Sequence, residues 1–287
     1  MSNSRPKYTC ILNKGWCTAL LCLVLPMACT FETAAPKFTV SIEPAAMILR
    51  ELVGDRGDVR VLLPHGASPH HYEPKPSDAR LAEVSMATFF FDFEVDGWAA
   101  KLAGDRAVAI AGSTHPGDEA SHHHNPHVWL DPIAVRELLP ELCEILVRLD
   151  PDGESAYQTN AEQFGERLTQ LDAELQSTFE NVGGRGVVQA HASWDLFFER
   201  YKIPMIGVLE STPGAALPPQ QFARLIDAVS EGAVFAVIAE PQLPRAGLET
   251  LAAGKVPIVE MDPIGDGDVM YEAFIRQNAN RLAKAMQ

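Results

Sequence analysis

The sequence predicts an α/β protein in which one long, rigid helix joins two lobes, each built on a sheet of parallel-type strands. Residues 37–42, 44–53 and 59–63 carry the apolar patterns of a strand, a helix and a strand, and this order is typical of a βαβ unit. Residues 153–181 form the longest helical pattern, with apolar side chains at every third or fourth position among Glu and Gln. Strand and helix patterns alternate again from residue 185 onward. We therefore expect the long helix to connect two α/β halves.

Local signals mark where several of these elements begin and end. Gly54 ends the first helix, and the glycine pair at 183–184 ends the long one. Ser77 is a candidate N-cap for a helix over residues 77–84, and Asp131 precedes the proline that opens a helix up to residue 149. These signals supply boundaries that periodicity alone leaves open.

The remaining elements and the domain division follow from the same patterns. In the first lobe we also expect strands at 88–93 and 107–111 and a helix at 95–102. In the second lobe we expect strands at 186–190, 205–209, 234–238 and 256–261, and helices at 194–201, 218–230, 248–253 and 269–286. The chain then divides into a leader (1–28), an N-terminal lobe (36–150), a connecting helix (151–184) and a C-terminal lobe (185–287).

The start of the chain has the features of a secretory signal peptide. Arg5, Lys7 and Lys14 precede an apolar run at 16–28, which is short for a membrane span. We expect residues 1–28 to be this signal peptide, and the protein to act in the periplasm or elsewhere outside the cytoplasm.

Cys29 directly follows Ala28, and the residues before it resemble the cleavage box of bacterial lipoproteins. The match is incomplete, because Leu25 lies one place too early. We expect a lipid anchor at Cys29. Two alternatives stay open: ordinary cleavage nearby, for example after Ala35, and a leader retained as a membrane anchor.

Composition narrows the chemistry of the body. Four of the five cysteines lie in or beside the leader, so the body keeps only Cys143 and can form neither a disulfide framework nor a zinc–thiolate cluster. A metal site in the body must therefore use nitrogen and oxygen ligands. The formal net charge of -15 argues against nucleic acid and anionic membranes as partners and is compatible with cations.

The histidines fall into two settings. Most of residues 112–125 are polar, and we expect a mobile loop there. His127 differs, because the apolar residues 128–130 follow it and can hold a ligand in one geometry. The loop histidines are candidates for a second, looser metal site: His115, His122, His123 and His124.

Four side chains occupy positions where a parallel sheet binds ligands. His70 lies in the loop after a strand, His127 follows the polar loop, and His191 and Asp262 follow strand patterns of the second lobe. Ligand sites in such sheets lie at the carboxyl ends of the strands. Two ligands from each lobe would hold a metal in the cleft between the lobes. Three imidazoles and one carboxylate suit zinc better than manganese, which favours more oxygen.

Each of these side chains also has a structural alternative. A lone histidine is often structural or merely solvated, and an aspartate before proline, as at Asp262, often caps a turn. We expect His65 and His71 to be neighbours of the site and not ligands. Glu73 and Glu240 are candidates for hydrogen bonds to metal-bound imidazoles.

An exported zinc hydrolase is the alternative from another functional class, because three histidines and an open position can make a catalytic zinc site. The chain has neither a His-Glu-x-x-His helix nor a Gly-x-Ser-x-Gly elbow. If Asp262 completes a tetrahedral site, no position is left for a reactive water. We therefore expect a binding protein and no enzyme.

Five short motifs resemble those of the zinc/manganese ABC-transporter solute-binding proteins, and within them the zinc-binding, ZnuA-like branch (cluster A-I). The resemblance covers about residues 37 to 287. The first two motifs are the most specific, and their order with the third makes a chance match improbable. The motifs are residues 66–78 (Gly-Ala-Ser-Pro-His-His-Tyr-Glu-Pro-Lys-Pro-Ser-Asp), 125–132 (Asn-Pro-His-Val-Trp-Leu-Asp-Pro), 191–194 with 201–204, 240–242, and 261–265.

The resemblance implies both ligands and task. His70, His127 and His191 fall on the family's imidazole ligands, and Asp262 falls on its carboxylate ligand, which some zinc-binding members replace with water. Histidine at position 191 favours zinc, because manganese members tend to have a carboxylate there. The implied function is capture of Zn(II) by a monomer that delivers the ion to the permease and ATPase of an ABC importer. A manganese-binding member and a surface adhesin on the same fold are the alternatives.

The ligand set also implies how binding should depend on pH and on motion. Zinc binds neutral imidazoles, so we expect affinity to fall as the pH drops through about 6.5, the ordinary histidine pKa. Closure of the two lobes is expected to complete the coordination, and contact with the permease to open it again.

Overall fold

The computed structural model of the chain describes residues 37–111, 125–210, 217–265, 267 and 269–287. Several expectations fall outside these residues: the signal peptide at 1–28, lipidation at Cys29, and the loop histidines His115, His122, His123 and His124. None of the helices in the described ranges has the length and apolar character that a membrane crossing requires.

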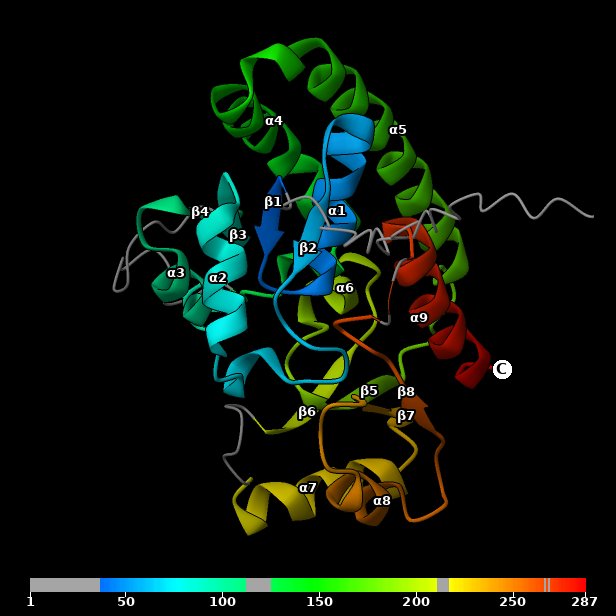
Figure 1. The fold of residues 1–287 in the computed structure, drawn as a ribbon. Helices are drawn as coiled ribbons and strands as arrows, with labels where there is room; N and C mark the ends of the chain where they lie inside the picture. The colour runs from blue at the N-terminus through cyan, green and yellow to red at the C-terminus, as the bar shows by residue number, and fades with distance from the viewer. Residues whose placement is uncertain (1–36, 112–124, 211–216, 266, 268) are drawn as a thin grey trace, which may run out of the picture. The chain divides into compact units, whose positions relative to one another are not determined.

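Two four-stranded sheets form the framework, and every strand pairing in them is parallel (Figure 1). The strand orders are β2-β1-β3-β4 and β6-β5-β7-β8. The predicted α/β class, with two parallel sheets and a long helix, is therefore confirmed. The first sheet contains β1 (Phe38–Val40), β2 (Val59–Val61), β3 (Ala87–Phe90) and β4 (Ala107–Ala109), and the second contains β5 (Gly186–His191), β6 (Met205–Glu210), β7 (Val234–Ala239) and β8 (Ile258–Glu260).

The helices lie where the sequence predicts them, within a few residues at each end. The α-helices are α1 (Glu43–Val53), α2 (Pro76–Val84), α3 (Gly97–Ala103), α4 (Pro132–Leu149), α5 (Glu154–Thr178), α6 (Asp195–Arg200), α7 (Pro219–Ser230), α8 (Ala246–Ala252) and α9 (Tyr271–Ala285). Short 3-10 turns are η1 (Gly54–Arg56), η2 (Pro69–His71), η3 (Gly104–Arg106), η5 (Val128–Leu130) and η6 (Pro151–Gly153).

The central strands of the second sheet are buried along their whole length. Every residue of β5 and β7 is buried, and β7 reads Val-Phe-Ala-Val-Ile-Ala without polar alternation. A parallel strand that is covered on both faces needs such a continuous apolar run. Figure 1 shows the cover: α7 and α8 pack on one face of this sheet and α9 packs on the other.

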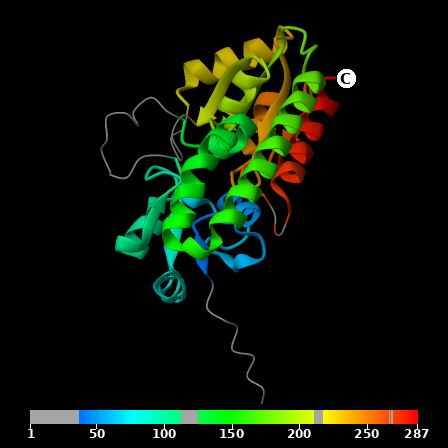
Figure 2. The ribbon, with the colours of Figure 1, turned by 90° about the horizontal axis from the view of Figure 1, so that it is seen from above.

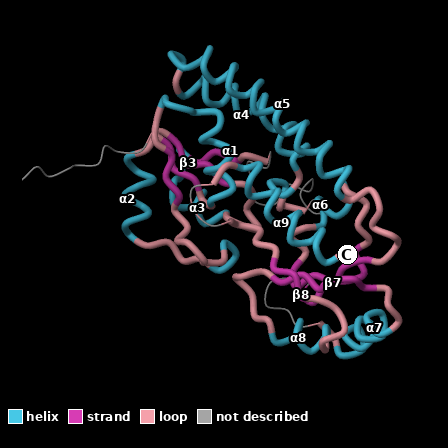
Figure 3. The backbone as a smooth tube through the Cα atoms, turned by 90° about the vertical axis from the view of Figure 1, so that its right-hand side faces the viewer, coloured by secondary structure: helices cyan, strands magenta, loops and turns pink. Residues whose placement is uncertain are grey.

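The long helix α5 contacts helices that pack around both sheets. It lies beside α4 and α1 in its first part and beside α9 further along, as Figures 2 and 3 show. Arg167 on α5 donates through Nε to Glu272 on α9 at 2.6 Å and also pairs with Glu51 on α1. One side chain in the middle of α5 thus joins the helix that follows β1 to the helix that follows β8.

One predicted helix start is wrong. Ser77 does not cap α2, because the helix begins one residue earlier, at Pro76, whose fixed φ suits a first turn. The capping contact comes from Asp78, whose carboxylate accepts a hydrogen bond from the backbone N–H of Lys75 at 2.7 Å. The proline and the aspartate together determine this start.

The predicted end of the long helix is also wrong. α5 ends at Thr178, before the glycine pair at 183–184. The chain leaves the helix at Phe179, whose buried ring packs against Phe197 and Tyr201 with centroid separations of 5.7 and 5.9 Å. Tertiary packing therefore sets this end, and the glycines serve the turn that follows.

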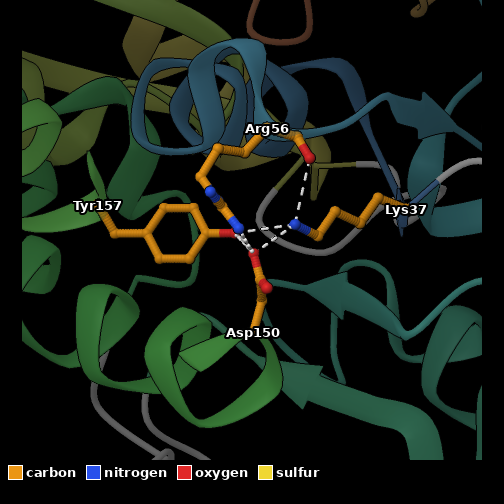
Figure 4. A network of polar contacts seen from close by, with 4 residues as sticks. All are labelled: Lys37, Arg56, Asp150 and Tyr157. Atoms are coloured by element: carbon orange, nitrogen blue, oxygen red, sulfur yellow. Dashed lines mark hydrogen bonds and ion pairs between the residues drawn. The ribbon is translucent and has the colours of Figure 1, made fainter. Parts of the chain in front are cut away.

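A polar cluster fastens the junction between α4 and α5 to the first sheet (Figure 4). Asp150 Oδ2 accepts hydrogen bonds from Lys37 Nζ at 2.5 Å, Tyr157 Oη at 2.6 Å and Arg56 Nη2 at 2.9 Å. These hydrogen bonds, led by that from Lys37, hold the pKa of Asp150 well below its ordinary range. The cluster joins residues from the start of β1, from η1 and from α5.

Replacing this carboxylate should destabilise the fold. We expect Asp150→Asn to lower the free energy of unfolding by about 1–3 kcal/mol at neutral pH. A neutral amide cannot replace the carboxylate that accepts hydrogen bonds from the charged Lys37 and Arg56. Denaturant unfolding followed by circular dichroism measures the change. Asp152→Asn is the matched control, since Asp152 is exposed, and it should cost little. Equal losses from the two variants would contradict the role given to Asp150.

Candidate metal centre

Three of the four predicted ligands meet in the folded chain. His70 lies in η2 after β2, His127 immediately precedes η5, and His191 is the last residue of β5. One ring nitrogen from each lies within 4.8 Å of the others. The ring centroids are 5.1 Å apart for His70 and His191, 5.2 Å for His127 and His191, and 5.7 Å for His70 and His127. This spacing permits three imidazoles to bind one ion.

Packing against aromatic side chains fixes the turn that carries His70. Trp98 on α3 donates its indole N–H to the carbonyl oxygen of Pro69 at 3.0 Å. The ring of Tyr72 packs on Trp98 with centroids 4.9 Å apart, and its hydroxyl donates to Asp78 at 2.7 Å. The residues on both sides of His70 are therefore held.

Asn125 orients His127 and links it to the strand end that bears His191. Its Nδ2 donates to the carbonyl oxygen of Ala192 at 2.7 Å, so its Oδ1 faces His127. That oxygen accepts the backbone N–H of His127 at 2.9 Å and lies 2.8 Å from its Nδ1. Nδ1 must then carry the proton, which leaves the Nε2 lone pair of His127 for a metal.

The segment after His127 is also fastened to elements around the second sheet. The fully buried Trp129 donates its indole N–H to the carbonyl oxygen of Pro263 at 2.7 Å. Tyr271, at the start of α9, donates to the carbonyl oxygen of Trp129 at 2.8 Å. Asp131, the N-cap of α4, pairs with Arg200 on α6. His127 therefore lies on a segment that is bonded to the loop after β8, to α9 and to α6.

Burial keeps the three imidazoles uncharged. It lowers the pKa of His70 to about 4, and the neighbouring His191 adds to the shift. Burial also lowers the pKa of His127 well below its ordinary value, with smaller contributions from His191 and His70. The pKa of His191 is lowered by burial too. Neutral imidazole is the form that binds a metal ion.

His191 carries the clearest sign of a missing partner. Both of its ring nitrogens are buried, and within the described ranges neither has a partner at good hydrogen-bond geometry, although the nearby backbone of Glu210 opposes the lowering of its pKa. Buried polar atoms without partners are rare in folded proteins and are unfavourable. A metal ion at the meeting point of the three rings would supply a partner for one of these two nitrogens.

The cavity beside the histidines has room for one ion. Its volume is about 20 Å³, close to the space that one water molecule needs. Glu240, at the end of β7, also lines it and accepts a hydrogen bond from Ser193 Oγ at 2.5 Å. Burial raises the pKa of Glu240 to about 8. The other lining residues are Ser68, Pro69, Gln242, Leu243, Pro263 and Ile264.

Asp262, the fourth predicted ligand, follows β8 but does not join the group of histidines. Its Oδ1 accepts hydrogen bonds from Gln242 Nε2 at 2.9 Å and from the backbone N–H of Ile264 at 3.0 Å. The side chain is therefore engaged both with its own loop and with the loop after β7.

Other predictions around the site have mixed outcomes. His71 is exposed, and neither it nor His65 belongs to the described histidine group. Glu240 accepts its hydrogen bond from Ser193 and not from a histidine. The orienting role of Asn125 was missed by sequence reasoning. The available signal was an amide two residues before His127, a spacing that allows one side chain to reach both the backbone and the ring.

The chain matches the family model described as zinc-uptake complex component A, periplasmic (ZnuA), over residues 39–285. The chain belongs to this family.

Individual ZnuA-family relatives agree with this assignment. The high-affinity zinc uptake system protein ZnuA of Yersinia pestis is 24% identical over 96% of this chain and 99% of its own. The manganese-binding lipoprotein MntA of Halalkalibacterium halodurans is 24% identical over 87% of this chain and 88% of its own. A crystal structure of ZnuA has a TM-score of 0.77 at 25% identity, covering 87% of this chain and 98% of the other.

The family places the chain in one functional class. Its relatives are metal-binding, substrate-binding components of ABC transporters, and they are not enzymes. The expectation of a binding protein is thereby confirmed, and the alternative of an exported zinc hydrolase is excluded. The metals named among the relatives are zinc and manganese.

Removing the Asn125 side chain should weaken metal binding without unfolding the chain. We expect Asn125→Ala to lower zinc affinity about 10–100-fold, because His127 loses the acceptor that fixes its ring orientation and tautomer. Isothermal titration calorimetry with a competing chelator measures the change. Asn181→Ala, at an exposed position, is the control. An unchanged affinity in Asn125→Ala would show that the ring does not depend on this amide.

Proposed function

We propose that this ZnuA-family protein captures Zn(II) outside the cytoplasmic membrane and delivers it to the permease and ATPase of an ABC importer. The observation that carries this proposal is the meeting of three uncharged imidazoles at one small cavity, His70 half-buried and His127 and His191 buried, with both nitrogens of His191 unpartnered. Nitrogen donors at this spacing suit zinc.

The ligands that we propose are His70, His127 and His191, with Asp262 as the carboxylate that completes the coordination. Asp262 follows a strand of the same sheet as His191 and lies next to Pro263, which lines the cavity. Binding an ion through Oδ1 requires that oxygen to leave the hydrogen bonds from Gln242 and Ile264.

Manganese is the second candidate cargo. The relative MntA is named for manganese, and Asp262 would supply the harder oxygen ligand that this ion favours. Zinc is preferred here because the three donors that already meet are all imidazole nitrogens.

The domain division predicted from the sequence extends the proposal. The leader is residues 1–28, the N-terminal lobe 36–150, the connecting helix 151–184 and the C-terminal lobe 185–287. The body is a monomer that Cys29 anchors through a lipid. The fastening of α5 to both α1 and α9 favours small lobe movements over a wide hinge opening.

Neighbouring histidines allow a matched test of the ligand assignment. His70→Ala should lower zinc affinity at least about 100-fold, because it removes one of the three nitrogens that meet at the cavity. His71→Ala removes the same group from the adjacent, exposed position and should leave affinity within about threefold. Competition calorimetry on both variants measures the difference. Equal, small losses would remove the basis for this site.

The pH dependence of binding should differ from that of ordinary histidines. The expectation of a loss near pH 6.5 is replaced, because burial lowers the pKa of His70 to about 4 and lowers those of His127 and His191. Protons therefore compete with the metal only in stronger acid. Zinc affinity should change little from about pH 7 to about pH 6 and fall more steeply towards pH 4, where His70 takes up a proton.

Two further measurements sharpen this pH prediction. The metal-free fold should lose stability as the pH drops below about 6.5. Below this pH the histidines of the unfolded chain become protonated, whereas the three site histidines of the folded chain, whose pKa values are lower, do not. Glu240→Gln removes the other cavity group with a shifted pKa, so its profile isolates the histidines. A tenfold loss of zinc affinity in that variant between pH 7 and pH 6 would contradict the account.

A further inference from the structure

Gln242 stands between the cavity and Asp262. It lies in the loop after β7 and lines the cavity together with the three histidines. Its Nε2 donates to Asp262 Oδ1 at 2.9 Å. The two residues are 20 positions apart and follow neighbouring parallel strands, β7 and β8, so the contact joins two adjacent strand ends of the second sheet.

The orientation of the Gln242 amide is set by this contact. Its other polar atom, Oε1, is buried and has no hydrogen-bond partner in the part of the chain that the structure describes. If the amide were turned over, Oε1 would face the carboxylate oxygen of Asp262 and the two acceptors would repel each other. The bond to Asp262 therefore holds Gln242 in an otherwise unfavourable position.

The backbone of Asp262 is fixed independently of Gln242. Asn278, buried on α9, accepts the backbone N–H of Asp262 at 2.8 Å and donates to its carbonyl oxygen at 3.1 Å. With the backbone held at both groups, the Asp262 carboxylate can approach the histidines chiefly by rotation of its side chain. A rotation that presents Oδ1 to the ion breaks the hydrogen bond from Gln242.

We propose that Gln242 is a specificity-determining residue that makes ligation by Asp262 less favourable and so favours zinc over manganese. The inference rests on the proposed function of the histidine site. Zinc is satisfied by the imidazole nitrogens with little help from a carboxylate, whereas manganese depends more strongly on oxygen ligands. A hydrogen bond that competes for the carboxylate therefore lowers the affinity for manganese more than the affinity for zinc.

The restraint can be removed without touching a proposed ligand. Gln242→Leu deletes both polar atoms of the amide, and Gln242→Met does so while keeping a long, flexible side chain. In either variant manganese affinity should rise about tenfold, the size expected when a hydrogen bond to a carboxylate no longer competes with ligation. Zinc affinity should change less than about threefold. Gln221→Leu, at an exposed position on α7, is the control and should change neither affinity.

A double variant separates this role from a general structural one. If Gln242 acts through Asp262, the manganese gain must disappear in Gln242→Leu/Asp262→Asn. Affinities for both ions are measured on the whole protein by chelator competition, and thermal unfolding confirms that the metal-free variants are folded. A gain that survives Asp262→Asn, an equal change for both ions, or no manganese gain in either Gln242 variant overturns the inference. A wild-type protein that binds no zinc would instead overturn the proposed function.

Discussion

Three imidazoles that burial keeps neutral are the constraint around which this structure is arranged. A buried imidazole without a hydrogen-bond partner is unfavourable, and His191 leaves both of its nitrogens in that state. The same burial lowers the pKa of each ring, so protons do not fill the site at neutral pH. The features that make the metal-free site unfavourable are therefore those that make it ready for a cation.

The fold supplies the rigidity that such a site needs. His191 ends a fully buried strand, and His127 lies on a segment that Asn125, Trp129 and Tyr271 fasten to elements around the second sheet. α5 ties α1 to α9 through Arg167, and Asp150 ties the start of α5 to the first sheet. Metal ligands held by such networks lose little freedom on binding.

The sequence predicts the order of elements well because each depends on local pattern. The apolar spacing of α5 and the continuous apolar run of β7 are visible without any partner. The errors arise where tertiary contacts decide: Phe179 packs against Phe197 and ends α5 early, and Pro76 with Asp78 displaces Ser77 at the start of α2. Such contacts join residues whose proximity no local pattern reveals.

The candidate site shows the same difference between what local patterns predict and what tertiary contacts decide. Position after a strand and the family motifs pointed to His70, His127 and His191, and the structure brings these rings together. The setting of Asp262 could not be predicted, because its partner Gln242 is 20 residues away on the neighbouring strand end. Sequence position indicated which carboxylate lies near the site, but only the three-dimensional arrangement shows what holds it.

Metal content under competition tests the central claim most directly. The purified protein is loaded with zinc and manganese together, and bound ions per chain are counted by native mass spectrometry. One tightly held zinc that resists excess manganese is the result that the account predicts. Absence of any tightly bound metal would contradict it, and leave the buried ring nitrogens of His191 without a partner.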